Sequence, residues 1–221
     1  MPTKIHSTRP NDMARDVLQG WAAVPVTILS DVTGGRLLVN PRIRPLRAFE
    51  LGTRMVGQAV TAWCEPTDFG PMLHAIDIAG EGDIIVVDAG GSVDTAYVGE
   101  LLCTVARRKK IAGLIVNGAV RDIDTLASWT DFPVYCLGTT ARGPLSKERG
   151  FVNGSIVFGG IPAKPGDIVL GDNDGLAIIP AEDAKTILAS AMERVHAEEK
   201  WMAELASGRT VVDVFSVPEA I

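Results

Sequence analysis

Cysteine, histidine and positive charge are all scarce in this sequence. Its 221 residues include three cysteines and three histidines, and 27 acidic residues outnumber 21 Lys and Arg, giving a formal net charge of −6. The widely spaced cysteines, Cys64, Cys103 and Cys136, form no CxxC pair, which disfavours a disulfide framework and favours a reducing compartment. Each cysteine lies among apolar residues, so we expect it in the core. The histidines have no metal-ligand spacing.

The shortage of positive charge also argues against a nucleic-acid-binding protein, which normally needs a basic face to displace counterions from phosphates. The one basic run, at 107–110, stands where a helix should end, and cations there complement the helix dipole. No apolar segment approaches the length of a membrane span, and the N-terminus lacks the charged-then-apolar pattern of a signal sequence. We therefore expect a cytoplasmic protein whose partners include neither nucleic acid nor membrane.

Several catalytic signatures are missing as well. The sequence contains no Gly-x-Ser-x-Gly elbow and no phosphate-binding loop. Its lysines stand in polar contexts, whereas a Schiff-base lysine needs an apolar pocket. The segment Asp172-Asn173-Asp174-Gly175 lacks the remaining ligands of a calcium loop, and we expect a tight turn between two strands there.

What the sequence does contain is enough apolar residues for one sizeable core. Hydrophobic residues make up 47% and charged residues 22% of the chain. We predict a single domain over 1–221, with an N-terminal helical segment at 1–22 and a C-terminal helix and tail at 181–221. The apolar share is slightly high for a monomer and hints at surface buried between subunits.

The order of the predicted elements indicates an α/β fold. Helices are expected at 10–22 (entered through Asn11), 72–79, 98–109, in a short segment ending near 129, and at 181–205. Strands are expected at 25–30, 54–64, 83–88, 111–116, 133–137, 155–158, 167–170 and 176–179, with an edge strand at 211–215.

The middle of the chain gives the clearest pattern. A strand at 83–88, a helix at 98–109 and a strand at 111–116 predict a right-handed βαβ unit with parallel strands. The carboxyl ends of its two strands then lie at one edge of the sheet, where open α/β sheets bind ligands. The loops that follow these strands, at 90–98 and 118–122, are therefore predicted to meet at a binding site.

The residues in these loops suit a small acid and a metal ion. Gly99 lets a ligand approach the backbone, and the first N–H groups of the helix, at 100–102, favour anions. Arg121 can hold a carboxylate in a bidentate fork, and Asp122 supplies an oxygen ligand of the kind that Mg²⁺ takes together with waters and substrate oxygens. Glu100 could orient a water for proton transfer. Alternatively, Arg121 and Asp122 form an ion pair at a helix start; the residues alone leave both interpretations open.

The motifs resemble those of the RraA-like family, which includes the 4-hydroxy-4-methyl-2-oxoglutarate/4-carboxy-4-hydroxy-2-oxoadipate aldolases. The resemblance covers the chain from about Pro25 onward and implies a compact layered β/β/α domain that assembles as a homotrimer or homohexamer. It is carried by Gly-Asp-Ile-Ile-Val-Val-Asp at 82–88, Gly99-Glu100-Leu101-Leu102, Gly118-Ala119-Val120-Arg121-Asp122, Pro165-Gly166-Asp167 and Asp172-Asn173-Asp174-Gly175.

The resemblance implies a role for each site residue. The backbone of Gly99, Glu100, Leu101 and Leu102 would contact the substrate, Arg121 would hold the pyruvate carboxylate, and Asp122 would bind Mg²⁺ or Mn²⁺. Glu100 matches an acidic residue that works through water. Family members also bring a Glu from a neighbouring subunit's C-terminal region, and Glu198 is the best match. The implied activity is cleavage of 4-hydroxy-2-oxo diacids to pyruvate by a metal-dependent aldolase, with oxaloacetate decarboxylation beside it.

Two details bear on this implied activity. The family also contains non-catalytic regulators that bind and inhibit an RNA-degrading endonuclease, and these typically lack an acid at the position of Asp122. Its presence favours the enzyme, while the regulator remains the alternative. The aldolase pattern tends to place a second acid three residues later, where this chain has Thr125; Asp124 lies one residue earlier.

Overall fold

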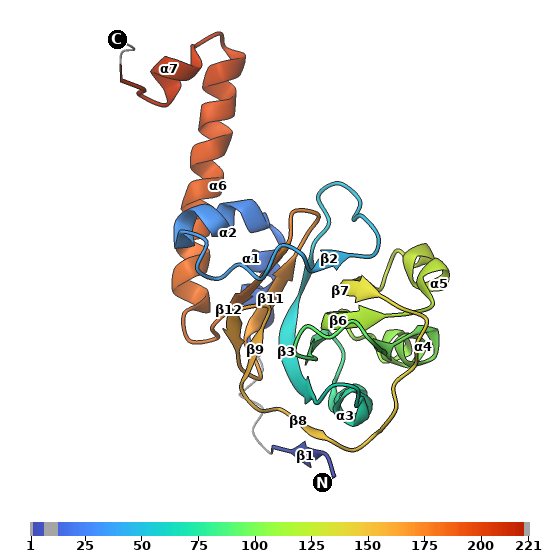
Figure 1. Cartoon of the computed structure of the whole chain (residues 1–221). Helices are drawn as coiled ribbons and strands as arrows, with labels where there is room; N and C mark the ends of the chain where they lie inside the picture. The colour runs from blue at the N-terminus through green and yellow to red at the C-terminus, as the bar shows by residue number, and fades with distance from the viewer. Residues whose placement is uncertain (1, 7–12, 219–221) are drawn as a thin grey trace.

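The computed structural model describes residues 2–6 and 13–218, and its centre is a mixed sheet (Figure 1). The strands β3, β4, β6 and β7 are parallel neighbours, in that order. Their bounds are β3 Met55–Cys64, β4 Asp83–Asp88, β6 Gly113–Val120 and β7 Val134–Thr139. Every residue of β4 is buried, as expected for a parallel strand that is covered on both faces.

Shorter strands complete the sheet at its two sides. The free edge of β3 pairs antiparallel with β11 over its first half and with β8 over its last three residues, and β2 pairs with β7. β11 forms a hairpin with β12, and β9 and β10 form a separate two-stranded sheet. The bounds are β1 Lys4–Ile5, β2 Arg44–Pro45, β5 Ala96–Val98, β8 Gly150–Val152, β9 Ile156–Phe158, β10 Ile161–Ala163, β11 Ile168–Gly171 and β12 Leu176–Ile179.

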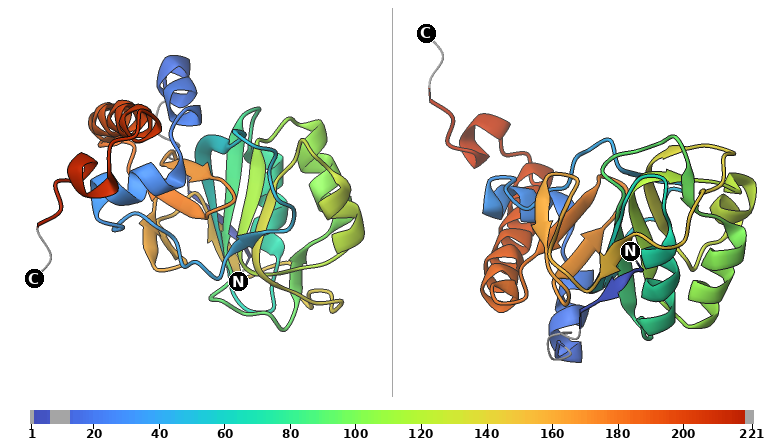
Figure 2. Two further views of the ribbon diagram at one scale, coloured as in Figure 1. Left: turned by 90° about the horizontal axis from the view of Figure 1, so that it is seen from above. Right: turned by 60° about the horizontal axis from the view of Figure 1, so that its bottom comes forward.

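Different layers cover the two faces of the parallel strands. Helices α3 (Gly70–Ile78), α4 (Glu100–Arg108) and α5 (Ile123–Ser128) lie on one side of the sheet (Figures 1 and 2). On the other face, β9 and the β11–β12 hairpin contribute Phe158 and Ile178 to a core that also contains Ile84 and Tyr135 from the main sheet. The layered β/β/α arrangement that the resemblance implies is therefore confirmed.

A further layer of helices covers the outer side of the β11–β12 hairpin. Helices α1 (Arg15–Ala22), α2 (Val26–Thr33) and the first part of α6 (Ala184–Ala206) form this layer, and their core includes Trp21, Leu29 and Ile187. The rest of α6 projects away from the domain and is followed by the short helix α7 (Val211–Val214) (Figure 1). Among the described residues, no helix is both long and apolar enough to span a membrane.

Most of the predicted elements are confirmed, including the parallel β4–α4–β6 unit. The predicted strand at 25–30 is wrong, because this segment forms α2, and the predicted edge strand at 211–215 is wrong, because it forms α7. In α7 the hydroxyl of Thr210 accepts the Asp213 N–H at 3.1 Å and so caps a helical turn. The expected cap Asn11 lies outside the described residues, and α1 begins at Arg15.

The three cysteines are buried, as predicted. Burial raises the pKa of Cys64 and Cys103 to about 12, and that of Cys136 to about 11. The thiols are therefore protonated at neutral pH and contribute to the core as small apolar groups rather than as nucleophiles.

One buried carboxylate ties the helical layer to the sheets. Asp172, 8% exposed, lies in the turn of the β11–β12 hairpin. Its Oδ2 accepts the N–H of Val26, the first residue of α2, at 2.9 Å, and its Oδ1 accepts the N–H groups of Asp174 at 2.9 Å and Gly175 at 3.4 Å. Its backbone carbonyl accepts the Tyr135 hydroxyl at 2.7 Å. The predicted tight turn is confirmed, and it also serves as a helix cap.

We expect Asp172→Ala to lower the free energy of unfolding by about 3 kcal/mol, because it leaves the buried N–H groups of Val26 and Gly175 without an acceptor. Asp174→Ala is the matched control, since the exposed Asp174 uses only its backbone in these contacts. It should change the free energy by less than about 0.5 kcal/mol. Urea unfolding followed by circular dichroism measures both; equal losses in the two variants would contradict the role given to the Asp172 carboxylate.

Candidate active site

A change of strand partner brings the two predicted loops together. β6 pairs with β4 as far as Asn117, and from Ala119 onward it pairs with the short strand β5. The ladder continues one step beyond β6, where the Arg121 N–H donates to the Val98 carbonyl at 3.1 Å. Gly99 therefore lies beside Arg121, and α4 starts next to the end of β6, as the βαβ pattern predicts.

Asp122 links the two loops through its side chain. Its Oδ2 accepts the N–H of Glu100, the first residue of α4, at 2.9 Å, and lies 3.7 Å from Nε of Arg121. Asp122 has a left-handed backbone (φ 60°), and its carboxylate makes no capping bond to its own helix α5. The ion pair of the alternative interpretation is thus present. However, the Arg121 and Asp122 side chains are 45% and 42% exposed, so both can also meet a ligand.

Gly99 is required here for space rather than for backbone freedom. Its φ of −150° is extended, a conformation open to any residue. A Cβ at this position would overlap the Asp122 carboxylate and lie 2.9 Å from Cγ of Arg121. The glycine therefore permits the packing of Arg121 and Asp122 against the start of α4, a reason that sequence spacing alone does not give.

Two hollows meet at Arg121 and Asp122. An open groove on one side is also lined by Glu100, Asp124 and Thr125, together with residues 139–141. A smaller hollow of about 280 Å³ on the other side is lined by Gly99, Leu101 and Leu102, with Phe69, Leu73, Ala96, Tyr97, Val98, Pro144 and Lys147. The N–H groups of residues 101 and 102 precede the first hydrogen bond of α4, which Cys103 donates to Gly99 at 3.1 Å. They are the kind of free helix N–H group that favours an anion.

The donors at this site fit a hydrated divalent cation. Across the described residues, no group of three or more His, Cys, Asp or Glu could hold a metal ion, which argues against an all-protein cage. The hydrogen bond of Asp122 to the Glu100 N–H and its ion pair with Arg121 nevertheless both use Oδ2, and the side chain is partly exposed. Mg²⁺ commonly takes one or two carboxylates and completes its shell with waters and substrate oxygens, and Asp122 suits that mode.

Thr125, where the aldolase pattern tends to have an acid, contacts Glu100. Its Oγ1 donates to Oε2 of Glu100 at 3.2 Å, so the side chain joins the first turns of α4 and α5. Asp124 is exposed and lines the same groove. The polar groups that line this groove are therefore three carboxylates, one guanidinium and the hydroxyls of several threonines.

Glu198 is not brought to this site within the chain. It lies on α6, where it pairs with Arg194 at 3.1 Å, and Arg194 also pairs with Asp31 at 2.8 Å. Figures 1 and 2 show α6 on the opposite side of the domain from α4 and α5. A Glu198 carboxylate could reach an Arg121–Asp122 pair only if it came from a second copy of the chain.

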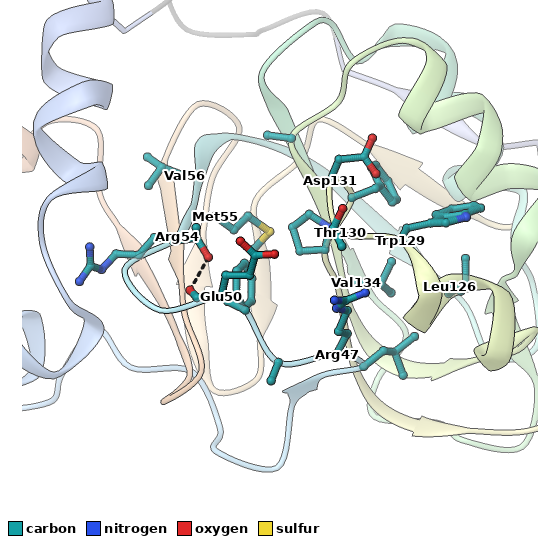
Figure 3. A pocket seen from close by; sticks show the side chains of 17 residues that line it. Arg47, Glu50, Arg54, Met55, Val56, Leu126, Trp129, Thr130, Asp131 and Val134 are labelled. Atoms are coloured by element: carbon teal, nitrogen blue, oxygen red, sulfur yellow. Dashed lines mark hydrogen bonds between the residues drawn. The ribbon is translucent and has the colours of Figure 1, made fainter.

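A separate cavity, of about 360 Å³, lies elsewhere (Figure 3). It opens near the first residues of β3 and β7, whereas Arg121 follows the last residue of β6. The cavity therefore lies at the other end of the parallel strands from the Arg121–Asp122 site. Met55, Val134 and Trp129 supply apolar lining, and Arg47 lies beside them, where it donates to the Ser128 carbonyl at 3.2 Å. Its lining comes from segments scattered along the chain, and no sequence motif marks it.

Asp88 is a buried carboxylate that sequence analysis did not single out. It ends β4, accepts the Asn117 side-chain amide at 2.7 Å and the Gly90 N–H at 3.2 Å, and its pKa is raised by burial. Its position at the end of a parallel strand was a usable signal, but its hydrogen bonds hold the end of β4 to β6 and shape the loop after β4. We assign it to that loop rather than to the groove.

Comparison with known proteins agrees with this architecture. The RraA-like family model, described as Aldolase/RraA, matches residues 21–178. A protein of Halalkalibacterium halodurans named "Putative 4-hydroxy-4-methyl-2-oxoglutarate aldolase" is 33% identical over 179 residues, which are 81% of this chain and 83% of that protein.

Solved structures show the same fold. An uncharacterized protein from Pseudomonas syringae superimposes with a TM-score of 0.79 at 25% identity, over 93% of this chain and 99% of that one. The RNA-processing inhibitor RraA from Thermus thermophilis gives a TM-score of 0.63 at 27% identity, over 71% of this chain and 92% of that one. From the extent of the family match and the identity to its relatives, the chain belongs to the RraA-like family.

Proposed function

We propose that this chain is a divalent-metal-dependent aldolase that cleaves 4-hydroxy-2-oxo diacids, such as 4-hydroxy-4-methyl-2-oxoglutarate, to pyruvate, and that it also decarboxylates oxaloacetate. The observation that supports this most is the joint placement of Arg121, Asp122 and the start of α4 around one accessible position. A cation, a carboxylate and free helix N–H groups together match the needs of a 2-oxo acid bound with Mg²⁺ or Mn²⁺.

Each residue has a distinct part in this proposal. Arg121 holds the C1 carboxylate of the 2-oxo acid, because its planar guanidinium can donate two parallel hydrogen bonds. The backbone at 99–102 lies along the substrate, with the N–H groups of residues 101 and 102 facing its negative charge. Asp122 would hold the divalent ion, which would supply Lewis-acid stabilisation for negative charge on the C2 oxygen.

Both reactions break the bond between C3 and C4. In the aldol cleavage, the C4 hydroxyl loses its proton, C4 becomes a carbonyl, and the electron pair of the broken bond forms the C2–C3 double bond of pyruvate enolate. In the decarboxylation, the same bond breaks with release of CO₂. Protonation of C3 then yields pyruvate in both reactions, and Glu100, which lines the groove, would direct a water for this proton transfer.

The assembly of the protein belongs to the same proposal. We propose a homotrimer or homohexamer in which the projecting part of α6 brings Glu198 to the site of a neighbouring chain. The exposure of Met202, Val211, Val212 and Phe215 along the end of α6 and α7 supports this, since such apolar side chains commonly become buried between subunits.

The first test is pyruvate release from oxaloacetate by the wild type and by Asp122→Asn, with added Mg²⁺ and after EDTA. Asparagine keeps an acceptor for the Glu100 N–H and tolerates the left-handed backbone, so the variant should fold. Because it loses the charge that binds the metal, we expect kcat/KM to fall about 1,000-fold. Asp174→Asn, on the distant β11–β12 turn, should retain full activity.

The rates must be read above the background of the metal alone, because free divalent ions decarboxylate oxaloacetate. Aldol cleavage of 4-hydroxy-4-methyl-2-oxoglutarate, followed by the same pyruvate assay, tests the diacid substrate. If the wild type shows no metal-dependent turnover of either compound, the non-catalytic regulator, which would bind an RNA-degrading endonuclease, becomes the better explanation.

Mixing two inactive variants tests whether neighbouring chains complete the site. Asp122→Asn and Glu198→Gln should each be nearly inactive, and co-refolding them in equal amounts should restore about a quarter of wild-type activity, since random pairing leaves that fraction of sites with both native residues. Glu199→Gln, a change at the adjacent exposed residue, is the control and should remain active. Activity of Glu198→Gln alone at the wild-type level would remove Glu198 from the site while leaving the role of Asp122 intact.

A further inference from the structure

Glu100 is held to helix α5 at two points. Its backbone N–H donates to Oδ2 of Asp122 at 2.9 Å, and its side-chain Oε2 accepts the hydroxyl of Thr125 at 3.2 Å. The acceptor Asp122 and the donor Thr125 both lie at the start of α5, so one short segment holds both the backbone and the carboxylate of Glu100. Thr125 is the side chain that fixes where the carboxylate lies.

Without that contact, little would restrain the Glu100 carboxylate. Glu100 is exposed, and across the described residues its side chain makes no other hydrogen bond or ion pair. A glutamate of this kind has three rotatable side-chain bonds and would spread over many rotamers in water. The Thr125 hydroxyl selects those in which Oε2 faces α5, and among the described residues Oε1 has no hydrogen-bond partner, so it can accept from a water.

The nature of the donor also suits this groove. Glu100, Asp122 and Asp124 already place three carboxylates along it, with Arg121 as their one cationic neighbour among the lining residues. A hydroxyl can fix the Glu100 carboxylate without adding charge beside an anionic substrate, whereas a lysine would neutralise it by pairing. Thr140, another hydroxyl of the groove, is engaged elsewhere and accepts the Arg142 N–H at 3.4 Å.

We propose that Thr125 is a positioning residue, which acts on proton transfer through Glu100 by holding its carboxylate at the groove. This inference rests on the proposed function, because it assigns to Glu100 the water that protonates C3 of the enolate. A residue with this role affects the rate of the reaction more than the binding of the substrate, since Arg121 and the backbone at 99–102 bind the substrate without it.

The test compares Thr125→Val, Thr125→Ser and the wild type in pyruvate release from oxaloacetate with saturating Mg²⁺. Valine keeps the shape and loses the hydroxyl; we expect kcat to fall about tenfold with KM changed by less than about twofold, part of the range that a positioned acid or base supplies. Serine restores the donor, and its kcat should return to within about threefold of the wild type.

A second readout isolates proton transfer at C3. With pyruvate in D₂O, the C3–H bond breaks and its proton passes to a solvent water, while its electron pair forms the C2–C3 double bond and the carbonyl pair moves to the C2 oxygen of the enolate. A deuteron from solvent then forms a C3–D bond as the carbonyl is restored. Proton NMR follows the loss of the methyl signal. Thr125→Val should slow this exchange by about the same factor as kcat, because both pass through the same proton transfer.

The decisive comparison is made in a background without the Glu100 carboxylate. Glu100→Ala keeps the N–H that Asp122 accepts, and Glu100→Ala/Thr125→Val should be no slower than Glu100→Ala alone, since Thr125 then has nothing to hold. Ser128→Ala is the control on α5: it removes a hydroxyl that donates to the Thr125 carbonyl at 2.7 Å and does not touch Glu100. It should leave kcat unchanged.

Two results would overturn the inference while the proposed function stands. One is an active wild type whose kcat is unaffected by Thr125→Val. The other is an equal loss from Thr125→Val with and without the Glu100 carboxylate, which would mean that Thr125 only joins α4 to α5. A wild type that neither releases pyruvate nor exchanges its methyl protons would instead overturn the proposed function, and the role of Thr125 with it.

Discussion

The hydrogen bond from the Arg121 N–H to the Val98 carbonyl is the contact on which the whole site depends. It exists because β6 exchanges β4 for β5 as its partner after Asn117, so that the chain returning from β4 lies alongside the end of β6. That alignment places Gly99 and the start of α4 beside the end of β6. A different register would separate Arg121 and Asp122 from the N–H groups at the start of α4, which precede them by about 20 residues in the sequence.

Asp122 serves several partners with one carboxylate. Its Oδ2 satisfies the first N–H of α4 and lies near Arg121, and in the proposed function the same group also carries the metal ion. The first two contacts orient the side chain before any ligand arrives, which reduces the ordering that binding requires. The absence of a side chain at Gly99 is a condition of this arrangement, because a Cβ would occupy the position of the carboxylate.

The sequence predicts those parts of the structure that depend on neighbouring residues. The buried runs of β4 and β6 and the helix between them have local patterns, and so the meeting of Gly99 with Arg121 could be predicted. Helix α2 could not, since the acceptor for its first N–H is Asp172, 146 residues away. The short strand β5 has no periodicity to detect.

The backbone of Asp122 departs from that of an ordinary helix N-cap. An aspartate that begins a helix ordinarily accepts N–H groups of that helix, from an extended conformation. Asp122 instead adopts φ 60°, at a cost of about 1 kcal/mol. Its carboxylate consequently leaves α5 uncapped and turns toward α4 and Arg121. The carboxylate thus serves α4 and Arg121 rather than its own helix, and in the proposed function the same orientation presents it to the metal ion.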